Sequence, residues 1–220
     1  MTGIHERRRA LTKGERTRER LLRAAVDRFG STGFRATSVS QLSRDAGLTP
    51  AAAYAYFDDK ETFWRAAVQA DLDALRAEVA EQSAHSQRPI VEAMFAMIAG
   101  LQSHALAHRV MVEGSPHDLQ LVLGHPLFAG TTRLIEQGLA ARQAAGTLSP
   151  IANPHDLAVG METIIFSLVL SVVRAGMEGA PQRVDAVVAL LQFALGGPPT
   201  PQERVRLSVA ARVERGRCPS

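Results

Sequence analysis

The 220-residue sequence has one cysteine, Cys218, and few aromatic residues, which make up 5% of the chain. A single cysteine cannot form an internal disulfide, so we expect a fold that does not depend on an oxidising compartment. No segment shows the alternation of a β-strand, and the apolar residues are mainly Ala, Leu and Val, which favours an all-α protein. With 46% hydrophobic and 21% charged residues, the composition is that of a globular protein rather than a disordered one.

No targeting or membrane segment is predicted. Residues 1–20 are polar and basic, unlike a signal peptide. The most apolar run, residues 157–173, contains Glu162 and two serines and ends at Arg174. It looks short and too polar for a spanning helix, which needs about 20 apolar residues. We therefore expect a cytoplasmic protein without a membrane partner.

The charges are distributed unevenly along the chain. Lys and Arg against Asp and Glu number 12 against 7 in residues 1–60, 8 against 13 in residues 61–195, and 5 against 2 in residues 196–220. The net charges of these segments are +5, −5 and +3, which together give the +3 of the whole chain. A basic N-terminal segment on an acidic body indicates that one end meets a polyanion, although arginines on a surface can also cluster by chance.

Helical signals begin after a basic arm, residues 1–13, that contains Arg7, Arg8 and Arg9. Apolar residues at helical spacing follow from about residue 14, and Gly30 and Gly33 are expected to stop this first helix. A second helix starts near residue 38, where Ser38 and Gln41 have capping-box spacing, and ends at Gly47.

Thr49 is the expected N-cap of a third helix, and Pro50 occupies its first position, where a missing N–H costs nothing. This helix is expected to end near Phe57. Asp58 and Glu61 repeat the capping-box spacing for a fourth helix that reaches about residue 82.

Prolines mark the joints of the remaining helices, which we expect at residues 89–106, 119–123, 127–145, 154–177 and 181–195. A proline-rich break then precedes a basic tail, residues 196–220, in which residues 205–213 have the pattern of one more weak helix. The prediction is an all-α protein of about nine helices. We expect it to contain two domains, residues 14–60 and residues 61–195.

The helix pair joined at Gly47 has the spacing of a helix-turn-helix motif, so residues 14–60 are expected to form a DNA-binding domain. In such a motif a short helix is held so that its first turns enter the major groove of DNA. The sequence around it resembles the TetR family of transcriptional regulators, specifically over about residues 15–64. The resemblance is carried by Gly33-Phe34, Thr37-Ser38-Val39, Ala46-Gly47-Leu48-Thr49, Tyr54, Tyr56-Phe57, Lys60-Glu61 and Phe63.

The resemblance implies two groups of DNA-contacting residues. Phosphate contacts are expected from Thr37, Ser38, Thr49, Tyr54, Tyr56 and Lys60. Residues near base edges are expected to be Pro50, Ala51 and Ala55, with Gln41 and Arg44 on the flanking helix.

Two positions depart from the family pattern: Ala55 stands where a large aromatic residue or His is usual, and Ala53 where Leu is usual. Base reading by this helix is therefore expected to be thin and limited to thymine methyl groups. Specificity would come from Arg44, Gln41, the arginines of the arm and DNA shape. The alternative is that the two tyrosines and Phe57 are ordinary core aromatics. We favour this alternative for Phe57 and the phosphate role for the tyrosines.

Tight binding by a helix-turn-helix protein usually requires a dimer that reads two half-sites. In the family the last two long helices form this contact, and both carry wide apolar stripes here. The expected interface residues are Ile164, Leu168, Val172, Val184, Val187, Val188 and Leu191. Alternatively, both stripes only close the core of one protomer.

The middle helices are the expected site of a small apolar effector, so residues 61–195 are expected to form a ligand-binding and dimerisation domain. The candidate pocket residues, which share apolar character apart from two polar anchors, are Met94, Phe95, Ile98, Leu101, His104, Met111, Leu127, Phe128, Met161, Glu162 and Ile165. Clustered Met and Phe side chains are also typical of a plain core. His104 and His108, one helical turn apart, could ligate a metal, but exposed histidines on a helix are common and no metal or cofactor is expected.

An enzyme is not expected, because the sequence has no phosphate-binding glycine loop, nucleophile elbow, CxxC or zinc-protease motif. Asp71 and Asp73 are interpreted as a pair on a solvated helix face. The resulting hypothesis is a homodimeric, ligand-released repressor that recognises a palindromic operator in double-stranded DNA. The alternatives are a sensing protein without operator function and an activator.

Overall fold

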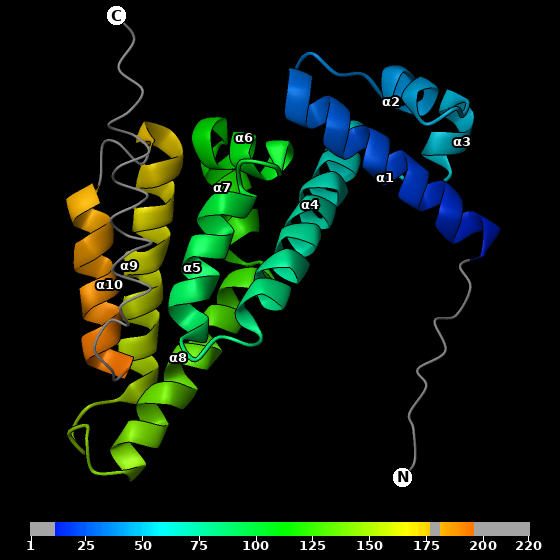
Figure 1. Cartoon of the computed structure of the whole chain (residues 1–220). Helices are drawn as coiled ribbons and strands as arrows, with labels where there is room; N and C mark the ends of the chain where they lie inside the picture. The colour runs from blue at the N-terminus through cyan, green and yellow to red at the C-terminus, as the bar shows by residue number, and fades with distance from the viewer. Residues whose placement is uncertain (1–11, 177–180, 196–220) are drawn as a thin grey trace, which may run out of the picture. The chain divides into compact units, whose positions relative to one another are not determined.

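The computed structural model describes residues 12–176 and 181–195 of the chain (Figure 1). These residues form ten α-helices and no strand, which confirms the all-α class. The described residues contain one helix more than the nine or so that the sequence indicated. Contacts divide the chain into two compact units, Met1–Ala70 and Asp71–Ser220. The basic arm with Arg7, Arg8 and Arg9 and the weak helix expected at residues 205–213 lie outside the described residues.

The N-terminal unit contains α1 (Lys13–Thr32), α2 (Val39–Asp45), α3 (Pro50–Tyr54) and the first turns of α4 (Lys60–Ser83). A capping box between Thr12 and Glu15 starts α1. The capping box predicted at Ser38 is present, and so is the N-cap at Thr49. Gly30 does not stop α1: it is buried inside the helix, which continues to Thr32 and is followed by Gly33.

Two other helix ends differ from the prediction. The third helix, α3, ends at Tyr54 and not near Phe57. The N–H groups of Tyr56 and Phe57 share the carbonyl of Ala53, at 2.9 and 3.1 Å, in the turn that follows the helix. The fourth helix is capped by Asp59 and not by Asp58, since the Asp59 carboxylate accepts the N–H of Thr62 at 2.6 Å. Both predictions were off by a few residues, as is usual for helix ends.

Aromatic side chains form the core of the N-terminal unit. The ring of Phe29 lies edge-on to Phe63 and Trp64, with ring centres 6.4 and 5.1 Å apart, and Phe57 stacks on Phe63 at 4.0 Å. Such pairs add about 0.5–1.5 kcal/mol each to the burial of their surface. Because Phe63 and Trp64 belong to α4, the N-terminal unit extends to Ala70 rather than to the expected boundary at residue 60.

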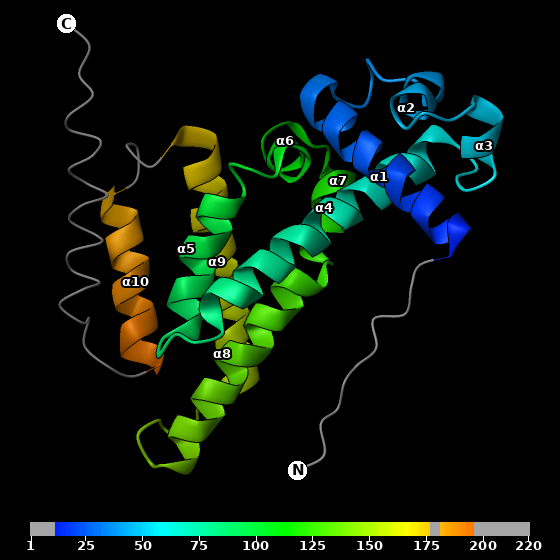
Figure 2. The same ribbon diagram turned by 45° about the vertical axis from the view of Figure 1, so that its right-hand side comes forward.

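The second unit contains the rest of α4 and six further helices: α5 (Pro89–Gly100), α6 (Ala105–Glu113), α7 (Pro116–Leu123), α8 (Pro126–Ala144), α9 (Pro154–Ala175) and α10 (Pro181–Leu195). Helix α9 packs against α5, α6, α8 and α10. Figures 1 and 2 show it side by side with α8 in both views. Of the six further helices, all except α6 have a proline in the first turn, as the sequence indicates.

The additional helix arises because the segment predicted as residues 89–106 is broken after Gly100. Helices α5 and α6 are bent by 92° relative to each other at this break. Gly100 allows α4 to approach closely, since a Cβ atom at this position would lie 2.5 Å from the Cδ1 atom of Leu75. No local pattern in residues 89–106 signals this contact with another helix.

Among the described residues, α9 is long and apolar enough to cross a membrane, with a mean hydropathy of 1.9 in its best window. The expectation that this run is too short and too polar was therefore wrong with respect to length and composition. Helix α9 nevertheless has buried residues along most of its length and packs against four neighbouring helices. The core helix of a globular unit has the same composition.

Candidate functional site

The turn between α2 and α3 is built on Gly47, which has a φ of 65°. A residue with a side chain is disfavoured in this left-handed conformation. The N–H of Gly47 returns to the carbonyl of Arg44 at 2.9 Å, and the N–H of Leu48 to that of Ser43 at 2.8 Å. Both bonds close the end of α2 and place Thr49 at the start of α3. The local sequence thus produces the predicted helix-turn-helix (Figure 1).

Helix α3 buries one side and exposes the other. Ala53 and Phe57 are buried, which confirms the packing role expected for Phe57. Tyr54 and Tyr56 are 53% and 37% exposed, so neither is a core aromatic. Pro50 and Ala51 at the leading end, and Ala55, are exposed as well. None of these three side chains can form a hydrogen bond, so Pro50, Ala51 and Ala55 could contact bases only through apolar atoms.

The capping box of α2 limits what Gln41 can do. The Gln41 Oε1 atom accepts both the N–H of Ser38, at 2.8 Å, and its hydroxyl, at 2.9 Å. A glutamine that reads adenine uses its oxygen and its nitrogen together. With the oxygen occupied, Gln41 offers only its amide N–H groups while the capping box is intact.

Thr37 and Lys60 hold the N-terminal unit together internally. Thr37 is 3% exposed, and its hydroxyl donates to the carbonyl of Gly33 at 2.8 Å. The Nζ atom of Lys60 donates to the carbonyl of Thr37 at 2.9 Å and lies 4.2 Å from the centre of the Phe34 ring. Phosphate contacts from these two side chains remain a prediction, and for Thr37 the burial opposes it. Ser38 and Thr49 are exposed, but both hydroxyls already accept backbone N–H groups of their helices.

An ion pair that sequence reasoning missed braces α2 against α1. Arg28 contacts Asp45 in a bidentate manner, with Nε 2.7 Å and Nη2 2.9 Å from the carboxylate oxygens. The hydrogen bond from Arg28 lowers the pKa of Asp45, and the charges of Arg28 and Arg44 lower it further. Arg44 itself is exposed at the end of α2, beside the turn. Helix pairing is needed to bring Arg28 to Asp45, so no sequence motif reveals the pair.

The predicted effector pocket is mostly filled core. Of its eleven residues only Phe95 and Glu162 are half-buried, and the others are buried. Burial raises the pKa of Glu162. His104 contacts Asp71 and Glu78 rather than an open cavity. Within the described residues no group of three or more His, Cys, Asp or Glu side chains is arranged to hold a metal.

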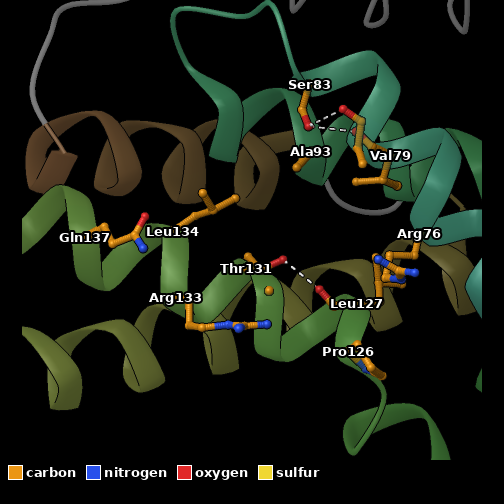
Figure 3. Close-up of a pocket in the computed structure, with 12 residues that line it drawn as sticks. Arg76, Val79, Ser83, Ala93, Pro126, Leu127, Thr131, Arg133, Leu134 and Gln137 are labelled. Atoms are coloured by element: carbon orange, nitrogen blue, oxygen red, sulfur yellow. Dashed lines mark hydrogen bonds between the residues drawn. The ribbon is translucent and has the colours of Figure 1, made fainter. Parts of the chain in front are cut away.

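An open cavity of about 380 Å³ lies instead between α4, α5 and α8, and we call it the α4–α5–α8 cavity (Figure 3). Leu127 is the one predicted pocket residue that lines it. The other lining residues are Arg76, Val79, Ala80, Ser83, Ala93, Pro126, Gly130, Thr131, Arg133, Leu134 and Gln137. The prediction chose the most apolar residues. Such residues fill the core, whereas an open cavity has a mixed lining.

The residues predicted for the dimer interface differ in exposure. Leu168, Val172, Val184, Val188 and Leu191 are buried within the protomer, which favours the alternative of a closed core for them. Ile164 is exposed and Val187 half-buried. Together with Ile164, other residues at helical spacing are exposed on the same two helices: Gly160, Thr163 and Ser167 on α9, and Ala186, Ala189, Leu190 and Phe193 on α10.

The N-terminal unit presents an exposed short helix from a glycine turn, and the second unit is a helical body that contains a cavity. An exposed short helix held by such a turn is the arrangement found in helix-turn-helix DNA-binding proteins. Residues 21–67 match the family model described as bacterial regulatory proteins, tetR family. The match covers the helix-turn-helix region, and together with the relatives below it makes the chain similar to the TetR family of DNA-binding transcriptional regulators.

A curated relative is the HTH-type transcriptional regulator UidR of Escherichia coli K12. It is 24% identical over 145 residues, which cover 64% of this chain and 74% of UidR. Among solved structures, Salmonella enterica GusR has a TM-score of 0.60 at 18% identity and covers 84% of this chain and 98% of its own. SmeT, the repressor of a Stenotrophomonas maltophilia multidrug efflux pump, has a TM-score of 0.55 at 19% identity, with 84% of this chain and 96% of SmeT covered. At these identities the structural likeness concerns the fold.

Proposed function

We propose that this chain is a cytoplasmic, homodimeric repressor that binds a palindromic operator and is released from it by a small, largely apolar effector. The observation that carries the proposal is the exposed surface of α3 with Arg44 beside it. Tyr54 and Tyr56 there offer hydroxyl groups to phosphates, and Arg44 offers a guanidinium group at the edge of the turn. Phosphate contacts of this kind orient a short helix on the duplex.

The exposed residues of α9 and α10 named above support a dimer that uses both helices. Phe193 is 84% exposed, which is costly for a large apolar side chain unless a partner covers it. Small residues such as Gly160 and Ala189 allow two helices to approach closely. A symmetric dimer formed through this face carries two helix-turn-helix motifs and therefore matches a palindrome.

The α4–α5–α8 cavity supports the release step. Helix α4 starts in the N-terminal unit at Lys60 and contributes Arg76 and Val79 to the cavity lining. A ligand that binds more tightly to a form in which the two motifs cannot reach both half-sites lowers operator affinity by its differential affinity for that form. Because α4 is one continuous helix, a shift of α4 on ligand binding would also move its first turn at Lys60.

Footprinting on the DNA that flanks the coding sequence, with duplexes of random sequence as the competitor, tests operator binding. We expect one protected palindrome and an affinity that falls steeply with salt. Activation instead of repression would be seen as increased transcription from the protected promoter. A protein that binds small molecules but no duplex at low salt would instead be a sensing protein without operator function.

The dimer face is tested with Ile164→Asp and the matched control Ile151→Asp. Ile151 is 94% exposed in the loop between α8 and α9 and lies outside the proposed face. Sedimentation should show monomers for Ile164→Asp and dimers for Ile151→Asp, and only the former should lose operator binding. Dimers formed by both variants would contradict the proposed face.

A further inference from the structure

We propose that the α4–α5–α8 cavity takes an amphipathic anion, in which an apolar body carries one negatively charged group such as a carboxylate or sulfate. This inference deepens the proposed function, since it rests on the cavity being the effector site. The lining includes two arginines, Arg76 and Arg133, and no Asp or Glu. A guanidinium is always charged at physiological pH, so the cavity carries two positive charges with no acidic residue in its wall.

Arg133 is positioned for such a contact. Its Nε atom donates to the carbonyl of Ala129, one turn earlier on α8, at 3.3 Å. This bond turns the side chain back along the helix, and Figure 3 shows it extended toward the Pro126 end of the cavity. Its terminal nitrogens have no acceptor among the described residues. They remain available for an anionic group, which guanidinium binds in a bidentate manner.

Arg76 stands on α4 at the same end of the cavity (Figure 3). Its Nε atom lies 3.5 Å from Asp73, and both side chains are at least half exposed. The same Asp73 oxygen lies 3.5 Å from the Nε2 atom of His125. The exposed carboxylate of Asp73 therefore lies near two nitrogen atoms, and an exposed ion pair of this kind contributes little to stability. An incoming anion can take up the terminal nitrogens of Arg76 without separating a strong ion pair.

The two hydroxyl groups of the cavity are already engaged as donors, which leaves the arginines and the neutral amide of Gln137. The hydroxyl of Ser83 donates to the carbonyl of Val79 at 2.7 Å, and that of Thr131 donates to the carbonyl of Leu127 at 3.1 Å. Gln137 is the remaining side-chain amide of the lining. The strongest donors in the cavity are therefore the positively charged arginines. A neutral or cationic ligand cannot form a charge-assisted hydrogen bond with them.

The remaining residues of the cavity lining are the reason for proposing a ligand with an apolar body. Val79, Ala80, Ala93, Leu127 and Leu134 contribute aliphatic surface from three helices. An aliphatic or aromatic group in contact with them gains about 25 cal/mol for each Å² removed from water. Apolar contact supplies affinity and the arginines supply selectivity for charge, which is the usual division of roles in ligand pockets.

The test uses octanoate, octanol and octylammonium, which share one alkyl chain and differ in charge. Binding to the full-length protein is measured by calorimetry, and operator release is measured separately by fluorescence anisotropy of labelled DNA. We expect octanoate to bind about tenfold or more tightly than octanol, and octylammonium to bind most weakly, because a charged hydrogen bond contributes at least about one factor of ten. Equal binding of octanoate and octanol, or no binding of any of the three, would overturn the inference.

Arg76→Gln and Arg133→Gln should each weaken octanoate binding about tenfold and leave octanol binding unchanged. Arg65→Gln is the matched control, because Arg65 is an exposed arginine of α4 that does not line the cavity. Thermal melting confirms that each variant is folded. If both cavity variants bind octanoate like Arg65→Gln, the charge assignment is wrong.

Octanoate that binds as expected but releases no DNA would contradict the proposed ligand release and leave the assignment of the cavity intact. Release of DNA by octanol but not by octanoate would support ligand release and contradict the assignment of the cavity to an anion.

Discussion

The Nδ1 atom of His104 lies 2.7 Å from the Oδ1 atom of Asp71, and both side chains are buried. The second carboxylate oxygen of Asp71 accepts the N–H of Ala107 at 2.8 Å. One carboxylate on α4 therefore holds both the residue that precedes α6 and the first turn of that helix. The interpretation of Asp71 and Asp73 as a solvated pair was correct for Asp73 only. Residues two apart on a helix do not share a face.

Replacing Asp71 should destabilise the protein strongly. Asp71→Ala leaves His104 and the N–H of Ala107 without their buried partner, and breaking such a pair costs about 3 kcal/mol. Urea denaturation followed by circular dichroism measures this loss. Glu81→Ala, an exposed acid on the same helix, is the control and should change stability by less than about 0.5 kcal/mol. A similar small effect for both variants would mean that the Asp71 contacts contribute little.

The stability of the fold should depend on His125 below neutral pH. Burial lowers the pKa of His125 from 6.5, although the nearby Asp73 charge opposes this. Since the folded state prefers the neutral ring, its contribution is fully present above pH 6.5 and is lost as pH falls through the lowered pKa. The ring also caps α8, because its Nδ1 atom accepts the N–H of Leu127 at 3.2 Å.

His125→Asn separates these two roles, since asparagine caps helices well but does not titrate near neutral pH. Stability curves measured from pH 8 to pH 5 should therefore fall less for His125→Asn than for the parent protein. A variant that loses stability over this range as steeply as the parent would exclude His125 as the source.

A methyl group at Gly100 should destabilise the second unit. In Gly100→Ala the new Cβ atom would meet the buried Leu75 side chain at 2.5 Å, and overpacking of this kind costs about 1–3 kcal/mol. Gly130→Ala is the matched control, because Gly130 lies within α8 and a methyl group there would have no neighbouring atom within 4 Å. That variant should gain up to about 1 kcal/mol from the better helix propensity of alanine. Thermal melting that ranks the two variants in the reverse order would contradict the close approach of α4.

Removing the hydroxyl of Tyr54 should weaken DNA binding without changing stability. Tyr54→Phe would delete the hydrogen bond that we propose Tyr54 forms with a phosphate, and such a bond is worth about 1 kcal/mol, or roughly a fivefold loss of affinity. Since phosphates carry no sequence information, operator and random duplexes should lose affinity alike. Anisotropy titrations on both duplexes measure the two losses. Unchanged affinity would remove Tyr54 from the interface, and a loss confined to the operator would assign it to base recognition.

The helix-turn-helix was predictable because its signals are local. Ser38 with Gln41, Gly47, and Thr49 with Pro50 each act on residues within a few positions of themselves, and the structure has all of them in the expected places. The boundaries of α1, α3 and α4 were less certain, because several neighbouring residues can cap a helix. Asp59 and Asp58 are chemically identical, and only packing selects between them.

The amino-acid sequence by itself determined the helical class, the order of most helices and the glycine turn, because periodicity, caps and prolines act over one or two helical turns. Tertiary structure decided which apolar faces are buried, that Leu168 and Val188 belong to the protomer core, and that the cavity is lined by Arg76 and Arg133. An amphipathic stripe has the same pattern whether it covers a neighbouring helix, a ligand or a second subunit. The choice among these depends on residues distant in sequence, which meet only when the helices pack.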